Sequence, residues 1–162
     1  MKNLQIKQNR LDLFIYESNN IADARELAMD KLTALDIELG ELANEIKFFK
    51  YWKKNKLIDK SKVVEEACDC FHFILSLAND NDVNLRVMTY GTFSRDIGIL
   101  YRFIKACLWK DIYSEDKWEE GLKRILMLLV AMLEELDFTY ADLLREYDRK
   151  YEINIKRQME GY

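Results

Sequence analysis

Two pairs of acidic residues are the part of this sequence best suited to chemistry. Glu38 and Glu41 are three residues apart, and so are Glu66 and Asp69. Residues three apart are neighbours on one face of a helix, so each pair brings two carboxylates together. Carboxylate oxygens without histidine or cysteine suit Mg²⁺, with Mn²⁺ as its substitute. Such an ion activates water and neutralises phosphate charge, and Glu45, one turn after Glu41, is the expected outer ligand or water-orienting residue.

The two acidic pairs lie within a weak internal repeat of apolar residues. Apolar side chains recur at helical spacing in two segments. The first segment has Leu35, Leu39, Leu42, Ile46 and Phe49. The second has Val63, Ala67, Cys70, Ile74 and Leu77, and each of these lies 28 residues after its counterpart in the first. The same offset relates Glu38 to Glu66 and Glu41 to Asp69. Matching stripes predict two antiparallel helices that form half of a helical bundle. The four acids would converge beside the seam and require a cation, whereas a single E-x-x-E pair is more often a solvated surface.

The rest of the chain supplies the helices that would hold this seam in place. The sequence has no proline and five glycines, which favours long uninterrupted helices. Hydrophobic residues make up 49% of the 162 residues and charged residues 33%, as in one folded domain. We predict an all-α bundle in a single domain, residues 1–162, with about six helices near residues 4–17, 21–54, 61–79, 93–109, 114–136 and 139–160. The expected N-terminal caps of the last two helices and of the third are Ser114, Thr139 and Ser61.

Composition also limits the partners and the cellular compartment that we expect for the protein. A net charge of -4 argues against binding of a nucleic acid polymer by the chain as a whole. The first ten residues lack the apolar run of a signal peptide, and no stretch reaches about 18 apolar residues, so we expect no membrane span. Cys68, Cys70 and Cys107 lack metal-ligand spacing and are expected to be reduced core residues of a cytoplasmic protein.

A lysine-rich segment connects the two acidic helices. Between residues 47 and 62 it has a single acid, Asp59, and seven lysines, Lys47, Lys50, Lys53, Lys54, Lys56, Lys60 and Lys62. These lysines form either a solvated helix end or a phosphate clamp beside the metals. Aromatic residues are interleaved with them, and some must pack in the core. The alternative for Trp52 is to stack on the base of a nucleotide.

The lone histidine, His72, follows Asp69 by three residues and lies about opposite the apolar stripe of its own helix. Cys68, Phe71 and Leu75 border the same side. This pattern predicts a second packing surface, such as a dimer interface. His72 itself is either a buried histidine with satisfied hydrogen bonds or a hydrogen-bonding group in a base pocket.

Several short segments accompany the acidic motif. They are Q-x-x-L-D at 8–12, F-K-Y-W at 49–52, D-x-x-H-F at 69–73 and a C-terminal segment at 150–162 that keeps most of the pattern K-N-x-x-N-x-x-R-Q-x-x-G-Y. With E-x-x-E and E-x-x-D, these segments resemble the dimeric all-α dUTPases of the MazG-like nucleotide pyrophosphohydrolase group. The length is most similar to phage or prophage members. Tyr151 departs from the C-terminal pattern, which has asparagine there, and residues 83–117 match no motif and are expected to be a less typical insert region.

The resemblance implies hydrolysis of dUTP to dUMP and pyrophosphate by a homodimer whose sites draw on both subunits. It implies that Mg²⁺ is held by Glu38, Glu41, Glu66 and Asp69, and that Glu38, supported by Glu45, orients or deprotonates the attacking water. The phosphate-binding residues it implies are Lys50, Lys53, Lys150, Asn154, Arg157 and Tyr162. The base-binding residues it implies are Gln8, Asp12, Trp52 and His72.

Three alternatives stay open on the sequence alone. A related enzyme could act on another nucleoside triphosphate, such as dCTP. A phage protein of this kind could instead act by binding a repressor protein through its acidic helical surface. A purely structural bundle is the third alternative, in which the acids serve only as solvated side chains.

Overall fold

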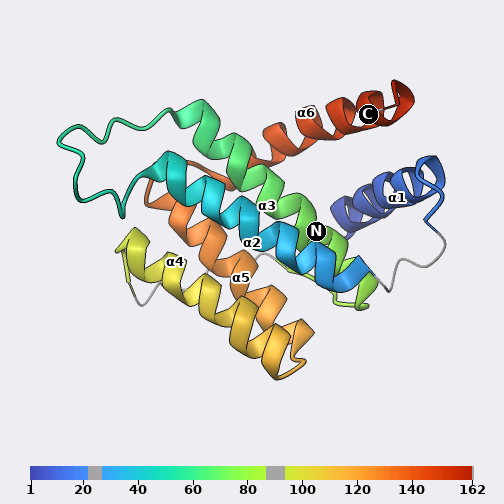
Figure 1. The fold of residues 1–162 in the computed structure, drawn as a ribbon, viewed down its shortest axis with the longest axis horizontal. Coiled ribbons are helices and arrows are strands. Elements are labelled where there is room, and N and C mark those ends of the chain that lie inside the picture. Colours follow the sequence, from blue (N-terminus) through green and yellow to red (C-terminus); the bar gives the residue numbers. More distant parts are fainter. Residues whose placement is uncertain (22–26, 87–93, 162) are drawn as a thin grey trace.

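The chain folds as an all-helical bundle in the computed structural model, which describes residues 1–21, 27–86 and 94–161 (Figure 1). The described elements are α1 (Lys2–Ser18), α2 (Ala28–Ile46), α3 (Lys60–Asp80), α4 (Ile97–Ala106), the π-helical turn η2 (Cys107–Ser114), α5 (Trp118–Glu134) and α6 (Tyr140–Met159). No strand occurs among these residues. The predicted fold class, an all-α bundle of six α-helices, is therefore confirmed.

The α3 helix is the centre of the bundle and contacts α1, α2, α5 and α6. Figure 1 shows α2 lying along α3, with α1 and α6 on the other side of α3. The predicted stripes meet in the seam between α2 and α3, where the buried residues are Leu35, Leu39, Leu42, Ile46, Val63, Ala67, Cys70, Ile74 and Leu77. Phe49 does not belong to this seam, because it lies beyond the end of α2 and is 44% exposed.

The opposite side of α3 is a second packing surface, as the sequence pattern predicts. Cys68, Phe71, His72 and Leu75 are all buried there. The surface is covered by α1 and α6 of the same chain, so no partner subunit is needed to explain its burial. The Phe71 ring, for example, meets the Tyr147 ring of α6 edge to face at 5.8 Å.

The prediction that the second helix continues to Lys54 is wrong. This helix ends at Ile46, because Lys47 takes a left-handed conformation (φ 63°) and donates its backbone N–H to the Ala43 carbonyl. In the segment between α2 and α3, lysine side chains then donate hydrogen bonds to carbonyl groups of the same segment. Lys47 Nζ donates to the Leu57 carbonyl at 2.7 Å and Lys56 Nζ to the Phe48 carbonyl at 3.3 Å. At least some of these lysines therefore stabilise their own loop.

Two of the three predicted helix caps are also wrong. The cap of α3 is Asp59 rather than Ser61, since the Asp59 carboxylate accepts from the backbone N–H groups of Ser61 and Lys62. Ser114 lies in η2 and donates to the Trp109 carbonyl, and α5 begins after Lys117 without a side-chain cap. The third prediction is confirmed, because Thr139 and Asp142 form a reciprocal capping box at the start of α6.

All three cysteines are free and buried, as predicted. Among the described residues, no helix has both the length and the apolar character that crossing a membrane requires. The fourth helix begins at Ile97, a few residues after its predicted start near residue 93, because the Asp96 side chain caps it by accepting from the Ile99 backbone N–H. Residue 93 itself lies outside the described residues.

The position of the α3 cap can be tested by a matched pair of substitutions. Asp59→Ala is expected to lower the urea midpoint of unfolding more than Ser61→Ala, because it removes the acceptor of two backbone N–H groups at the start of α3. Ser61→Ala removes only a hydroxyl that donates to Asp59. Equilibrium urea denaturation followed by circular dichroism measures both midpoints. The reverse order would show that Ser61 is the cap.

Candidate metal and nucleotide site

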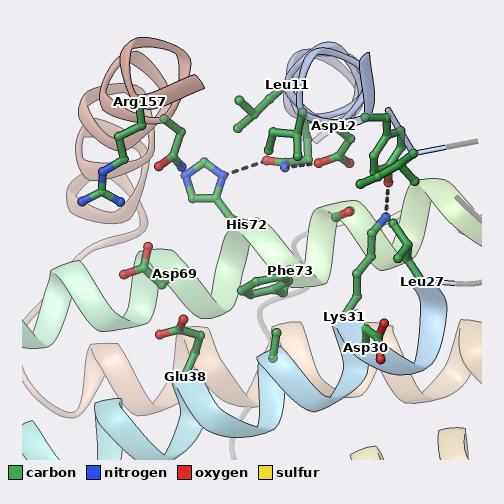
Figure 2. Close-up of a pocket in the computed structure, with 17 residues that line it drawn as sticks. Leu11, Asp12, Leu27, Asp30, Lys31, Glu38, Asp69, His72, Phe73 and Arg157 are labelled. Atoms are coloured by element: carbon green, nitrogen blue, oxygen red, sulfur yellow. Dashed lines mark hydrogen bonds between the residues drawn. The ribbon is translucent and has the colours of Figure 1, made fainter. Parts of the chain in front are cut away.

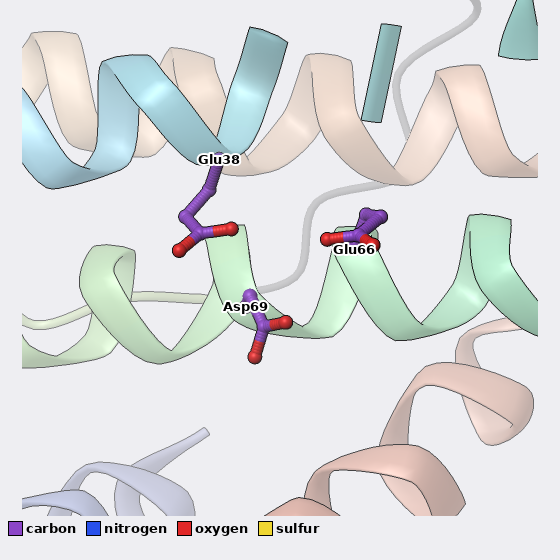
Figure 3. Close-up of side chains that lie close together, drawn as sticks. All are labelled: Glu38, Glu66 and Asp69. Carbon is purple, nitrogen blue, oxygen red and sulfur yellow. The ribbon is translucent and has the colours of Figure 1, made fainter. Parts of the chain in front are cut away.

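Three of the predicted acids converge where α2 meets α3. Glu38 of α2 and Glu66 and Asp69 of α3 each offer one carboxylate oxygen, and these oxygens lie within 4.8 Å of one another (Figure 3). All three side chains are half-buried, because their neighbours along each helix belong to the apolar seam. Three carboxylate oxygens this close together are a donor set that hard cations such as Mg²⁺ or Mn²⁺ fit.

The electrostatics of this group favour a bound cation. Burial, followed by the nearby charges of Asp69, Glu41 and Glu66, raises the pKa of Glu38 from 4.5 to about 7. Burial also raises the pKa of Glu66 and of Asp69, and Asp69 adds to the effect at Glu66. Three carboxylates in this position therefore resist ionisation together. A divalent cation between them would remove that cost.

Glu41 and Glu45, the other two acids predicted for this site, lie further along α2. Glu41 is exposed and is not one of the three converging carboxylates, but its charge raises the pKa of both Glu38 and Glu66. Glu45 is half-buried one turn later and also stands outside the converging group.

Lys150 of α6 is the cation nearest to the acids. Its Nζ lies 2.5 Å from Asp69 Oδ2 and 3.2 Å from Glu65 Oε1, and the residue is buried. Burial works against the charged form, but the contacts with Asp69 and Glu65 raise the pKa of Lys150 above its ordinary value. Asn154 and Arg157 follow at spacings of four and three residues, so the three predicted phosphate-binding residues of α6 share one helix face.

A cavity of about 460 Å³ extends from the carboxylates between α1, α2, α3 and α6 (Figure 2). Glu38 and Asp69 line one end of it, and Asn154 and Arg157 line it from α6. Gln8, Asp12, His72 and Ser76 contribute polar groups, among apolar neighbours such as Leu11 and Phe73. This volume suits a small organic ligand. A small number of polar groups in an otherwise apolar wall would fix the orientation of such a ligand.

The polar groups of the cavity form a buried hydrogen-bonded network. Gln8 Nε2 donates to Asp12 Oδ1 at 2.8 Å, Gln8 Oε1 lies 2.8 Å from His72 Nδ1, and Tyr147 Oη donates to Gln8 Oε1 at 3.0 Å. Burial, with the charges of Lys150 and Lys7, lowers the pKa of His72 to about 3, so the imidazole is neutral at neutral pH. Within the described part of the chain, His72 Nε2, Asp12 Oδ2 and Ser76 Oγ are buried without a hydrogen-bond partner.

The predicted residues of the lysine-rich segment are not brought to this cavity. Trp52 is 60% exposed and does not line it, and neither Lys50 nor Lys53 does. Lys50 Nζ instead donates to the backbone carbonyl of Asn44 at 3.0 Å. Tyr162, predicted to bind phosphate, lies outside the described residues.

Two further groups were not predicted from the sequence, namely Lys31 in the wall of the cavity and Tyr147 in contact with the lining residue His72. Tyr147 is fully buried and stacks on His72 with ring centroids 4.4 Å apart and an interplanar angle of 22°. Lys31 of α2 forms a buried ion pair with Asp80 and contacts Tyr16 Oη, which ties α1, α2 and α3 together at the far end. Tyr147 could have been found, because it lies one turn before Lys150 on the same face of α6. Lys31 and Asp80 carry no local signal.

The comparison with protein families gives one result that covers every residue. A family described as dUTPase matches residues 1–162. No curated protein matches the sequence.

The raised pKa of Glu38 leads to a test on the metal-free protein. Between about pH 4.5 and about pH 7, folded Glu38 retains a proton that the unfolded chain releases. This group therefore makes the free energy of unfolding fall as pH rises through that window. Glu38→Gln should make the fall smaller, and the part that remains comes from Glu66 and Asp69, whose pKa values are also raised. Urea denaturation in the presence of a chelator, repeated across this pH range, measures the difference between variant and wild type.

Glu45→Gln is the control for this experiment, because it neutralises a glutamate of the same helix outside the converging group. It is expected to keep the wild-type dependence on pH. Parallel curves for wild type and Glu38→Gln would contradict the electrostatic description of the site.

Proposed function

Since the chain belongs to the dUTPase family, we propose that it hydrolyses dUTP to dUMP and pyrophosphate at a divalent-metal site built on Glu38, Glu66 and Asp69. The observation that carries this proposal is the position of the three carboxylates at one end of a cavity with both apolar and polar walls. Metal ligands beside a pocket for a small molecule suit a substrate that joins a polyphosphate to a base.

The proposed metal ligands are the three converging carboxylates together with Glu41, and Mg²⁺, or Mn²⁺ in its place, is the proposed ion. A bound ion of this kind supplies charge neutralisation for the phosphates and a position for the attacking water. Glu38 is the proposed group that orients this water or takes its proton, with Glu45 in support. The half-buried position of Glu38 between α2 and α3 holds its carboxylate toward the other ligands.

Phosphate binding is proposed for the basic and amide groups of α6. Lys150 touches Asp69, so a phosphate oxygen bound near the acids would lie within reach of the Lys150 ammonium. Asn154 and Arg157 line the cavity one and two turns further along α6. A planar guanidinium and an ammonium together match a polyphosphate better than either alone. Lys50, Lys53 and Tyr162 remain proposed phosphate ligands.

Base binding is proposed for the network around His72, because the polar atoms that have no hydrogen-bond partner in the described part of the chain belong to residues in the wall of the cavity. Trp52 is the exception among the proposed base-binding residues, since it lies in the exposed loop after α2. This separation supports the proposal of a homodimer in which Trp52, Lys50 and Lys53 of one subunit complete the site of its partner. The exposed aromatic side chain would then gain a binding role and lose its contact with water.

One domain, residues 1–162, is proposed to form the whole site. The first and last helices both line the cavity, through Gln8 and Asp12 of α1 and Arg157 of α6. This shared cavity supports the proposal of a single domain. A cytoplasmic setting, with its dUTP pool and reduced thiols, agrees with the three free cysteines.

A nucleotide panel tests the proposed activity. The purified protein should release pyrophosphate from dUTP in the presence of Mg²⁺ and not after chelation, with little hydrolysis of dCTP or dTTP. Glu66→Gln should lower kcat/KM by about 100-fold or more, since even outer-shell changes at metal sites cost about 10- to 100-fold. Glu152→Gln, an exposed glutamate of α6, is the control and should retain activity.

Hydrolysis of dCTP in place of dUTP would keep the metal site and overturn the uracil assignment. A folded protein that hydrolyses none of the three nucleotides would overturn the enzymatic proposal and favour the binding of a repressor protein.

Complementation tests the shared site. Trp52→Ala and Asp69→Asn should each lose most dUTP hydrolysis, and a mixture refolded together should regain about a quarter of wild-type activity. Half of the dimers are then mixed, and each mixed dimer has one intact site of two. Sedimentation velocity confirms that dimers are present. A mixture no more active than its components would show that Trp52 does not complete the partner's site.

A further inference from the structure

A buried relay of hydrogen bonds leads from Asp12 through Gln8 to His72 (Figure 2). The Tyr147 hydroxyl joins the relay at Gln8. None of these side chains is more than 7% exposed. Gln8 lies at the centre. Its amide nitrogen donates to Asp12 Oδ1, and its amide oxygen faces both the His72 ring nitrogen Nδ1 and the Tyr147 hydroxyl.

The chemistry of Asp12 fixes the orientation of the Gln8 amide. An ionised carboxylate only accepts hydrogen bonds, so the NH₂ group of Gln8 must face it. Burial raises the pKa of Asp12 above its ordinary value, although the Gln8 amide and the Lys31 charge favour the ionised form. The reversed amide would set two oxygens against each other and would leave the buried Tyr147 hydroxyl without its acceptor.

The orientation of Gln8 in turn fixes the proton on His72. Gln8 Oε1 is an acceptor, so the His72 nitrogen at 2.8 Å must be a donor, Nδ1–H. A neutral imidazole with a proton on Nδ1 has a lone pair on Nε2. Nε2 is buried and has no partner among the described residues, while His72 lines the cavity. The stacked Tyr147 ring holds the plane of the imidazole.

We infer that Asp12 and Tyr147 are positioning residues that act through Gln8 to hold His72 in its Nδ1–H form, so that His72 Nε2 accepts a hydrogen bond from the imide N–H of uracil. This inference rests on the proposed function for its ligand. Cytosine has a lone pair at the corresponding ring nitrogen, which would face the lone pair of Nε2. The relay therefore gives the cavity a means of choosing between the two bases.

Gln8 takes a different role here from the base contact that the resemblance implies. Both lone pairs of its amide oxygen are used within the protein, by His72 and Tyr147. Its side chain is 3% exposed. Gln8 thus transmits the orientation set by Asp12 and leaves the base to His72.

The tautomer can be measured without substrate, because His72 is the only histidine in the chain. Protein labelled with ¹⁵N-histidine and carrying no histidine tag should give one imidazole pattern in a two-bond ¹H–¹⁵N correlation spectrum at neutral pH. The expected pattern is that of the neutral ring with its proton on Nδ1. A proton on Nε2, or a charged ring, would overturn the relay.

Variants test which residues set the tautomer. Asp12→Asn places an amide that can face Gln8 in either direction, and Tyr147→Phe removes the second donor while it keeps the stacked ring. Both should add the Nε2–H form to the spectrum and reduce the preference for dUTP over dCTP in kcat/KM by about tenfold, the loss expected for one hydrogen bond. Tyr140→Phe, which removes a hydroxyl elsewhere on α6, should keep one tautomer and the full preference.

The two readouts separate failure of the relay from failure of the proposed function. If wild-type His72 has its proton on Nδ1 and the Asp12 and Tyr147 variants keep the same tautomer, the positioning roles of Asp12 and Tyr147 are overturned. A wild-type Nδ1–H form in a protein that does not hydrolyse dUTP places the failure in the proposed function and overturns uracil as the ligand. Circular dichroism of each variant confirms that it is folded.

Discussion

The seam between α2 and α3 forces acidic side chains into a half-buried position, and the geometry of the site follows from this constraint. Leu39 of α2 and Ala67 and Cys70 of α3 are fully buried, so the side chains beside them cannot move far from the helix contact. Glu38 and Asp69 are held at that edge, where ionised carboxylates repel one another. The fold thus stores an unfavourable interaction that a cation would relieve, as expected for a functional site.

The central helix α3 joins this acidic site to the cavity. Asp69 and His72 are three residues apart, so they lie on neighbouring positions of one rigid element. Asp69 faces Glu38 and Lys150, while His72 faces the network under α1. A ligand that reached both residues would be held with its parts at a fixed separation. This placement is why burial on both sides of α3 matters for function as well as for stability.

The lysine-rich loop shows how composition and structure can lead to different conclusions. Its charge and aromatic residues suggest a phosphate clamp and a stacking residue, yet within one chain Lys50 and Trp52 lie away from the cavity. Lys47 and Lys56 satisfy carbonyl groups of the loop itself. A positive segment can therefore be maintained by local hydrogen bonds whatever its role in a larger assembly.

The sequence by itself determined the helices and the α2–α3 seam, because apolar residues at spacings of three and four define one face of a helix whatever surrounds it. The 28-residue repeat placed Glu38 and Glu66 in matching positions. The Thr139 cap was predicted from the residue type at the start of the last helix. Local pattern could not show that α2 stops at Ile46, since that end depends on a left-handed lysine. The network of Gln8 with His72 and Tyr147 was decided only by tertiary structure. These residues are brought together by the packing of α1 and α6 on α3, and the periodicity of a single helix does not encode which distant helices cover it.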